Sequence, residues 1–217
     1  GTRTFSSEDN ALTITLQGDG KTKIAGIVDA ASLLYELYII SASLTQEVSI
    51  DFSRYMPMCY AESFAFLQDI EEFYLKGPSL QETDVTYRMA KGLVTDFFRE
   101  VDSLKTGSNA NIAKLRFTHA EIMIPFVAYL GIPNGATPVA ADDTYAYENN
   151  TWRGSEICPM TANIQWDVYR NAEGQYLVKM YLNEKERNFK SGTEKYLYGS
   201  TKFYYDYEGL RKAYLTD

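Results

Sequence analysis

The sequence has few of the residues from which metal and redox sites are usually built. Its 217 residues include one histidine, His119, and two cysteines, Cys59 and Cys158. Zinc sites combine several His and Cys ligands at short spacings, and no such cluster occurs here. We therefore expect neither a metal ion nor another cofactor. A disulfide between the two cysteines and a pair of free thiols both fit the sequence.

The sequence also has fewer basic than acidic residues. The chain has 21 Lys and Arg against 29 Asp and Glu, a net charge of −8 and a sequence pI of about 4.8. Proteins that bind nucleic acid need a basic surface, so we expect no nucleic-acid partner. A local basic pocket inside an acidic protein can still bind an anionic small molecule.

Two further patterns are missing. The chain has no run of about 18 apolar residues, so we expect no transmembrane segment. It also has no Gly-x-Ser-x-Gly motif, the strand-to-helix turn that exposes the serine of α/β-hydrolases. The first residues are polar and show no signal-peptide pattern, which does not by itself decide whether the protein is exported.

The apolar residues follow helix and strand periods. Spacings of three and four predict helices over residues 24–43, 58–76, 84–104 and 206–215. Alternation predicts strands over residues 11–16, 112–117, 160–169 and 175–183, the last two joined by a turn at residues 171–174. The first helix is apolar enough for burial on more than one face.

This order of elements predicts three parts. Residues 1–23 form an N-terminal segment with one strand, residues 24–108 a helical subdomain, and residues 109–217 part of an α/β domain. The fold class is therefore mixed α/β. Parallel sheets are normally covered on both faces, and this chain has too few strands to build one alone. We expect the sheet to be incomplete.

The stretch from Ile112 to Ile132 contains the candidate site. A short apolar strand runs into a helix that ends at Gly131, and His119 lies at the junction. Such junctions favour anions, because backbone N–H groups and the helix dipole meet there. His119 and Glu121 point to the same side in an extended or turn backbone. Either residue also has a plain structural explanation, as a hydrogen-bonded core histidine or a helix-start charge.

Lys114 and Arg116 alternate with apolar residues along the predicted strand and so share one face. Arginine offers a two-pronged donor for phosphate or carboxylate, so this face is a candidate phosphate-binding surface. A solvated strand face fits the same pattern. Pro125 lies inside the predicted helix, where it removes one hydrogen bond and predicts a distorted first turn.

Several segments, in order, resemble the histidine acid phosphatases, in particular the branch of multiple inositol polyphosphate phosphatases. Residues 115–121, LRFTHAE, are similar to that branch's F-x-H-A-E segment, and Pro125 and residues 130–132, LGI, continue it. Three further segments resemble the same branch: LQDIEEFYLKGP at 67–78, WRGSEICPMTAN at 152–163, and VKMYLNEK at 178–185. The resemblance covers roughly residues 55–190 and implies the histidine-phosphatase fold, with a helical insert beside the α/β domain.

The resemblance implies a phosphomonoesterase that acts on inositol polyphosphates such as phytate. In such enzymes a histidine of an Arg-His-Gly-x-Arg motif attacks phosphorus, a second histidine binds the phosphoryl oxygens, and a nearby glutamate protonates the leaving alcohol. His119 then takes the phosphoryl-binding role and Glu121 that of the acid. Arg116 and Lys114 remain candidate phosphate ligands. The ligand implied is an anionic phosphorylated small molecule, and the location implied is secreted, periplasmic or luminal.

The sequence departs from this family in one important respect. It contains no Arg-His-Gly, so the nucleophile is missing. One interpretation is the C-terminal part of a larger phosphatase, whose partner is the missing N-terminal part of the same protein. The other is a relative that binds phosphate, or serves as a structural domain, without turnover. In both cases we expect this chain alone to be inactive.

Overall fold

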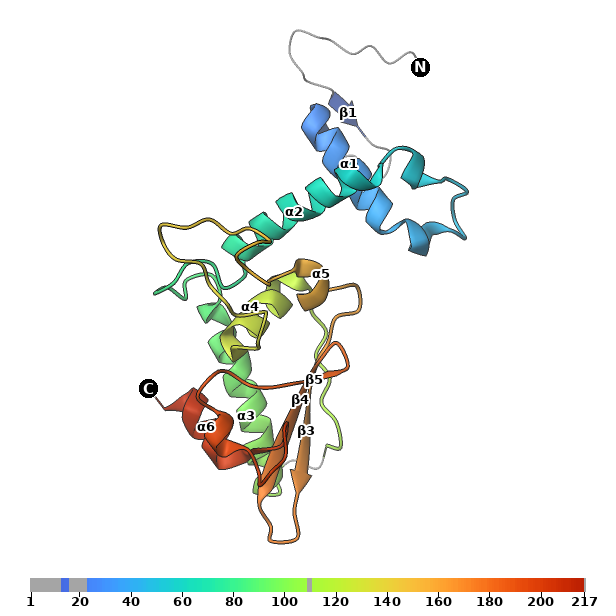
Figure 1. Cartoon of the computed structure of the whole chain (residues 1–217). Helices are drawn as coiled ribbons and strands as arrows, with labels where there is room; N and C mark the ends of the chain where they lie inside the picture. The colour runs from blue at the N-terminus through green and yellow to red at the C-terminus, as the bar shows by residue number, and fades with distance from the viewer. Residues whose placement is uncertain (1–12, 16–22, 109–110, 217) are drawn as a thin grey trace. The chain divides into compact units, whose positions relative to one another are not determined.

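The computed structural model describes residues 13–15, 23–108 and 111–216 (Figure 1). These residues fall into two compact units, Gly1–Gln68 and Asp69–Asp217. In the part that is described, no helix is both long and apolar enough to cross a membrane.

The first unit is mainly helical. A short antiparallel hairpin of β1 (Thr13–Thr15) and β2 (Lys23–Ala25) leads into α1 (Ile27–Ile39). Two 3-10 turns follow, η1 (Ser41–Leu44) and η2 (Phe52–Arg54), and then α2 (Met58–Leu75) begins. The predicted burial of the first helix on more than one face is wrong, because no residue of α1 is buried. Within the unit α1 packs on η2 and stacks Tyr35 against Phe64, which covers only part of its apolar surface.

The second unit contains the remaining helices. After α2 come a 3-10 turn, η3 (Arg88–Ala90), and α3 (Lys91–Lys105). Next are α4 (Ala120–Leu130), a single turn α5 (Gly154–Ile157) and, at the end of the chain, α6 (Tyr207–Leu215). The predicted second, third and last helices are confirmed to within a few residues, except that the start of the third, residues 84–90, consists of turns and η3.

The sheet of this unit is antiparallel. Strands β3 (Ile164–Arg170) and β4 (Tyr176–Leu182) form the predicted hairpin, with Val168 opposite Val178. On its other side β4 pairs with β5 (Lys185–Arg187) and β6 (Tyr205–Asp206). Strand β5 is not predicted by the sequence pattern, because the turn before it has two residues at positive φ, Asn183 and Glu184, and no glycine.

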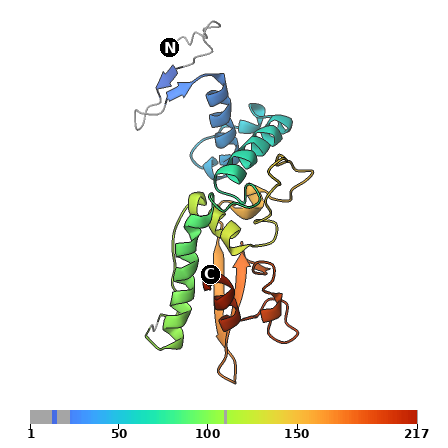
Figure 2. The ribbon, with the colours of Figure 1, turned by 90° about the vertical axis from the view of Figure 1, so that its left-hand side faces the viewer.

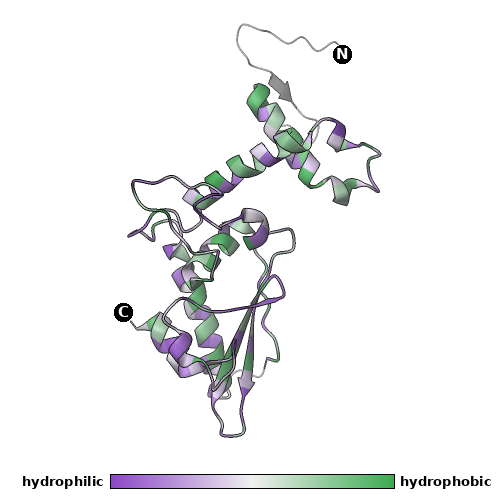
Figure 3. Ribbon diagram, in the orientation of Figure 1, coloured by the Kyte–Doolittle hydropathy of each residue, from purple (hydrophilic) through white to green (hydrophobic). Residues whose placement is uncertain are grey.

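Helix α3 lies along one side of the sheet, as Figures 1 and 2 show from two directions. Its rings Phe97 and Phe98 contact Trp166 of β3 at centroid distances of 5.2 and 5.0 Å. The hydropathy colouring of Figure 3 shows that α3 has both apolar and polar residues. This amphipathic helix therefore covers the sheet with its aromatic side and leaves carboxylates on another.

Hydrogen bonds connect the last helix, α6, to the end of α4. The Tyr214 hydroxyl donates to the carbonyl of Leu130 and accepts from the backbone N–H of Lys190 at 3.1 Å. The Lys190 ammonium donates to the carbonyl of Ala213 at 2.7 Å. Burial raises the pKa of Tyr214, which keeps this hydroxyl protonated as a donor.

Residues 112–117 are not a strand of the sheet, so this prediction is wrong. A β-strand is defined by its pairing, and these residues have no paired neighbour within the described ranges 13–15, 23–108 and 111–216. They run from the end of α3 back to the start of α4 as a single chain segment (Figure 1).

Candidate active site

The site is built on the first turn of α4. His119 precedes the helix with extended backbone angles, φ −124° and ψ −179°, and its carbonyl accepts the N–H groups of Ile122 and Met123, each at 3.1 Å. Its imidazole makes no capping hydrogen bond and is exposed. The helix then continues through Pro125 to Gly131. The exposed imidazole of His119 and the exposed carboxylate of Glu121 therefore both lie at the start of a helix that is otherwise mostly buried.

The carboxylate of Glu121 lies beside a lysine from another element. The ammonium of Lys76, just after α2, is 3.5 Å from Oε1 of Glu121 and 2.8 Å from Oε1 of Glu72. Burial lowers the pKa of Lys76, but the hydrogen bond and charge of Glu72 and the charge of Glu121 outweigh it, and the pKa lies above its ordinary value. Lys76 is thus a fixed cation at the start of α4.

The pKa of Glu121 is lowered from its ordinary value of 4.5. The hydrogen bond from the residue's own backbone N–H is the largest cause, followed by the charge of Lys76. Both causes favour the ionised form, as a helix N-terminus does for any carboxylate. In the free chain Glu121 is therefore a carboxylate at neutral pH.

Cys158 also lies near this group. Burial raises the pKa of its thiol, and the charges of Glu72 and Glu121 raise it further. A thiol with a raised pKa is a poor nucleophile at neutral pH. Both Cys158 and Cys59 are free thiols in the structure.

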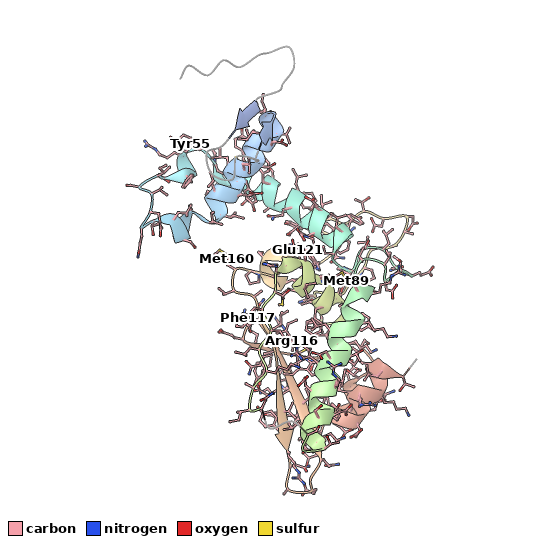
Figure 4. All side chains as sticks on the ribbon, turned by 180° about the vertical axis from the view of Figure 1, so that it is seen from behind. Tyr55, Met89, Arg116, Phe117, Glu121 and Met160 are labelled. Carbon is pink, nitrogen blue, oxygen red and sulfur yellow. The ribbon has the colours of Figure 1, made fainter. Side chains whose placement is uncertain are left out.

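Arg116 and Lys114 contact α3 rather than α4. Arg116 pairs with Asp96, lies 4.0 Å from Glu100 and stacks on Phe97 with its Cζ 4.6 Å from the ring centroid. Lys114 pairs with Glu100. Figure 4 shows Arg116 on the side of α3 and Glu121 at the start of α4. A phosphate at Arg116 would have to compete with these carboxylates, and phosphate binding by Arg116 and Lys114 stays a prediction.

Lys76 and Glu72 are neighbours of Glu121 that the sequence pattern does not predict. Glu72 lies in the last turn of α2, and Lys76 follows directly after the helix, four residues later, where a cation is favoured by the helix dipole. The spacing therefore indicated an ion pair. It did not indicate which later element the pair would face, because Glu121 is 45 residues away in the sequence.

Comparison with known proteins places the chain in a family. The family model described as histidine phosphatase superfamily (branch 2) matches residues 27–183. The chain belongs to this family. The matched region includes Lys76, Arg116, His119 and Glu121.

Individual relatives agree with this assignment. The chain is 26% identical over 155 residues to multiple inositol polyphosphate phosphatase 1 of Gallus gallus, covering 67% of this chain and 34% of that protein. It is 37% identical to the crystal structure of Bifidobacterium longum multiple inositol polyphosphate phosphatase in complex with inositol hexasulfate, with a TM-score of 0.80. That match covers 92% of this chain and 41% of the other. The phosphate complex of the same enzyme matches with a TM-score of 0.77 at the same identity, covering 92% of this chain and 42% of that one.

These matches confirm the predicted fold class, a mixed α/β histidine-phosphatase fold. The chain spans about a third to two fifths of the length of the relatives it matches. Among the residues that the structure describes, no group of three or more His, Cys, Asp and Glu side chains is placed to hold a metal ion.

Proposed function

We propose that this chain is the C-terminal part of a histidine phosphatase that hydrolyses phosphomonoesters of inositol polyphosphates such as phytate. In this proposal His119 binds the phosphoryl oxygens and Glu121 protonates the leaving alcohol. The observation that supports it best is the grouping of His119, Glu121 and Lys76 at one helix start. An exposed imidazole, a carboxylate and a fixed ammonium are the groups that a phosphate monoester needs for charge stabilisation and proton transfer.

The lowered pKa of Glu121 places a condition on this role. A proton donor must hold a proton, and the free chain keeps Glu121 ionised. A phosphate dianion bound beside His119 would compete for the ammonium of Lys76 and add negative charge near Glu121. Both changes raise the pKa of a carboxyl group. We therefore infer that the ligand itself brings Glu121 to its protonated form.

The attacking group must come from elsewhere. A phosphatase that forms a phosphohistidine needs a second histidine, and His119 is the single histidine of this sequence. The proposed domain division, 24–108 as a helical insert and 109–217 as part of the catalytic domain, leaves the nucleophile to the missing N-terminal part. The secreted, periplasmic or luminal location implied by the family remains part of this proposal.

A second function is favoured by one observation, the absence of Arg-His-Gly from the sequence. In that case the chain binds a phosphorylated ligand through His119 and Lys76 without turnover.

Calorimetry with inositol hexakisphosphate tests the shared binding step. We expect His119→Ala and Lys76→Ala to weaken binding roughly tenfold each, the loss of one charge-assisted contact. Lys212→Ala, which removes an exposed ammonium of α6, is the matched control. Repeating the titration in buffers of different ionisation enthalpy should reveal proton uptake on binding, and Glu121→Gln should abolish it. Absence of any heat would contradict both binding proposals and leave a structural domain.

Measuring turnover distinguishes the two remaining proposals, a phosphatase and a binding domain without turnover. With p-nitrophenyl phosphate we expect no hydrolysis by this chain alone, because it has no second histidine. Hydrolysis that survives His119→Ala would contradict the assigned roles. A parent reading frame with Arg-His-Gly-x-Arg upstream would favour the phosphatase over the binding domain.

A further inference from the structure

Glu72 contacts Lys76 through both its main chain and its side chain. Its carbonyl, in the last turn of α2, accepts the backbone N–H groups of Lys76 at 3.0 Å and of Gly77 at 2.9 Å. Its carboxylate Oε1 lies 2.8 Å from the ammonium of Lys76. A Cβ added at Gly77 would lie 2.8 Å from the carbonyl oxygen of Phe73, so the chain turns tightly at this point. Glu72 therefore holds both the backbone and the side chain of Lys76.

The carboxylate of Glu72 is more enclosed than that of Glu121. The two side chains are 21% and 65% exposed, and Glu72 is also nearer to the ammonium, at 2.8 Å against 3.5 Å. Among the residues that the structure describes, Oε2 of Glu72 is buried and has no hydrogen-bond partner. A buried acceptor without a partner costs free energy, so stability alone does not explain a carboxylate at this position.

Two other titratable groups lie near Glu72. Its charge acts to raise the pKa of the Cys158 thiol and of the Asp69 carboxyl group, although burial is the largest cause for each. Asp69 already accepts a hydrogen bond from the hydroxyl of Tyr147 at 2.7 Å. The group that contacts the carboxylate of Glu72 directly is the ammonium of Lys76.

The ammonium of Lys76 can contact Glu72 and a ligand at the same time. An ammonium has three N–H donors. In the free chain Lys76 donates to Glu72 and, over a longer distance, to Glu121. Its side chain is 24% exposed, so an anion can reach it. Because exposed ion pairs are weak, an arriving phosphate displaces the exposed Glu121 more readily than the enclosed Glu72.

We propose that Glu72 is a positioning residue, which keeps the ammonium of Lys76 at the start of α4 while a phosphate takes the place of Glu121. This role rests on the proposed function, because it concerns the cation of the proposed phosphate site. Without Glu72 the ammonium would pair more closely with Glu121, and the phosphate would have to break a stronger ion pair. Glu72 therefore favours anion binding although it carries a negative charge itself.

The direction in which one substitution changes affinity tests this role. Glu72→Gln keeps the size of the side chain and removes its charge, so charge alone predicts tighter binding of an anion. Positioning predicts weaker binding. In calorimetry with inorganic phosphate and with inositol hexakisphosphate, we expect Glu72→Gln to weaken binding roughly fivefold. The matched control is Glu71→Gln, which removes the charge of the neighbouring exposed residue and should not weaken binding. Equal or tighter binding by Glu72→Gln would overturn the role.

A double-mutant cycle shows whether Glu72 acts through Lys76. In a Lys76→Met background, which has no ammonium at this position, adding Glu72→Gln should change binding by less than about twofold. A fivefold loss in that background as well would overturn the role, because Glu72 would then act on the ligand by another route.

The reactivity of Lys76 provides a readout that altered packing elsewhere would not change. Burial lowers the pKa of Lys76, and the hydrogen bond and charge of Glu72 raise it. A lysine must lose its proton before it can be acetylated, so Glu72→Gln should raise the acetylation rate of Lys76 roughly threefold. The rate is measured by peptide mass spectrometry, and Glu71→Gln should leave it unchanged. An unchanged rate in Glu72→Gln would overturn the role.

Thermal unfolding checks that each variant is folded. If Glu72→Gln does not fold, Glu72→Asp replaces it, because aspartate keeps the charge and retracts the carboxylate by one methylene group. Glu72→Asp should also weaken phosphate binding, and unchanged binding would overturn the role. Failure of the proposed function gives a different result. If the unmutated chain binds neither ligand, the proposed function is contradicted together with this role. If it binds both and Glu72→Gln binds them as tightly, the role alone is contradicted.

Discussion

The two halves of the stretch from Ile112 to Ile132 both contain large apolar residues, which are exposed in the first half and buried in the second. In the second half, Phe126, Leu130 and Ile132 are each no more than 2% exposed. In the first half, Ile112 and Phe117 are almost fully exposed. The second half is covered by α3 and η3 of its own unit. In the first half, Lys114 and Arg116 contact α3, while the side chains of Ile112 and Phe117 stay exposed. The difference therefore lies in the neighbours that cover each half.

This contrast shows what hydrophobic pattern does and does not establish. An apolar residue indicates that a surface will be covered, and says nothing about the polypeptide that covers it. Where the cover lies within the chain, substitutions should cost stability. Where it lies elsewhere, they should cost stability only in the assembled protein.

The largest effect is expected in the covered half. Phe126→Ala removes a ring that is 2% exposed and lies 5.1 Å from that of Phe97, so the free energy of unfolding should fall by about 4 kcal/mol. Chemical denaturation of the whole chain measures this. A loss below about 1 kcal/mol would mean that α4 is not part of a packed core.

The end of the same helix should be the next most sensitive position. Gly131 has φ 67°, and an added Cβ would lie 2.3 Å from Cβ of Lys190. We expect Gly131→Ala to cost about 2 to 3 kcal/mol, from backbone strain and a shift of Lys190. The control is Gly107→Ala, which has φ 70° but no neighbour within 4 Å and should show the strain alone, about 1 kcal/mol. Equal losses for the two variants would exclude the steric part.

A smaller, pH-dependent effect is expected where the two halves meet α3. Burial acts to raise the pKa of Asp96, but the hydrogen bond from Arg116 and the nearby charges outweigh it and hold the pKa below its ordinary value of 3.8. A carboxylate with a lowered folded pKa stabilises the fold above its unfolded pKa, and this contribution disappears as pH falls through the folded pKa. Asp96→Asn should therefore cost about 1 kcal/mol at pH 7 and progressively less below about pH 4.

Denaturation across this pH range, with the exposed Asp142→Asn as control, tests the Asp96 effect. If Asp96→Asn lowers the free energy of unfolding equally at low and neutral pH, the charge of Asp96 is not the cause. The loss would then come from altered packing of the side chain.

The smallest effect is expected in the open half. Phe117→Ala should change the free energy of unfolding of the chain alone by less than about 0.5 kcal/mol, because the ring is 94% exposed. Phe126→Ala is measured under the same conditions. If Phe117→Ala lowers the free energy of unfolding by about 2 kcal/mol or more, Phe117 is covered in solution and the two halves do not differ in burial.

Much of the fold could be predicted because it depends on local pattern. Periodicity located α2, α4, α6 and the hairpin of β3 and β4, and Gly131 marked the end of α4 as its positive φ requires. The strand expected at residues 112–117 failed because alternation predicts an extended backbone but provides no partner for it. The predicted burial of α1 is wrong for a similar reason, because an apolar pattern does not specify which element covers it.

The candidate site was predictable only in part. His119 and Glu121 are neighbours in sequence, so a single junction indicated both. Lys76 joins them through a contact between residues 45 apart, which depends on tertiary packing that no local pattern encodes. The pairing of Arg116 and Lys114 with the acidic side of α3 is non-local in the same way.

The bonds among Tyr214, Lys190 and Leu130 have a practical consequence for experiments on this protein. They tie the last helical turn of the chain to the end of α4, whose other end presents His119. Deleting the final turn would therefore release a carbonyl of α4 and the cation that contacts Ala213. Purification tags should be added beyond residue 216 through a flexible spacer, and shortened versions that end before Tyr214 should not be used to assay the site.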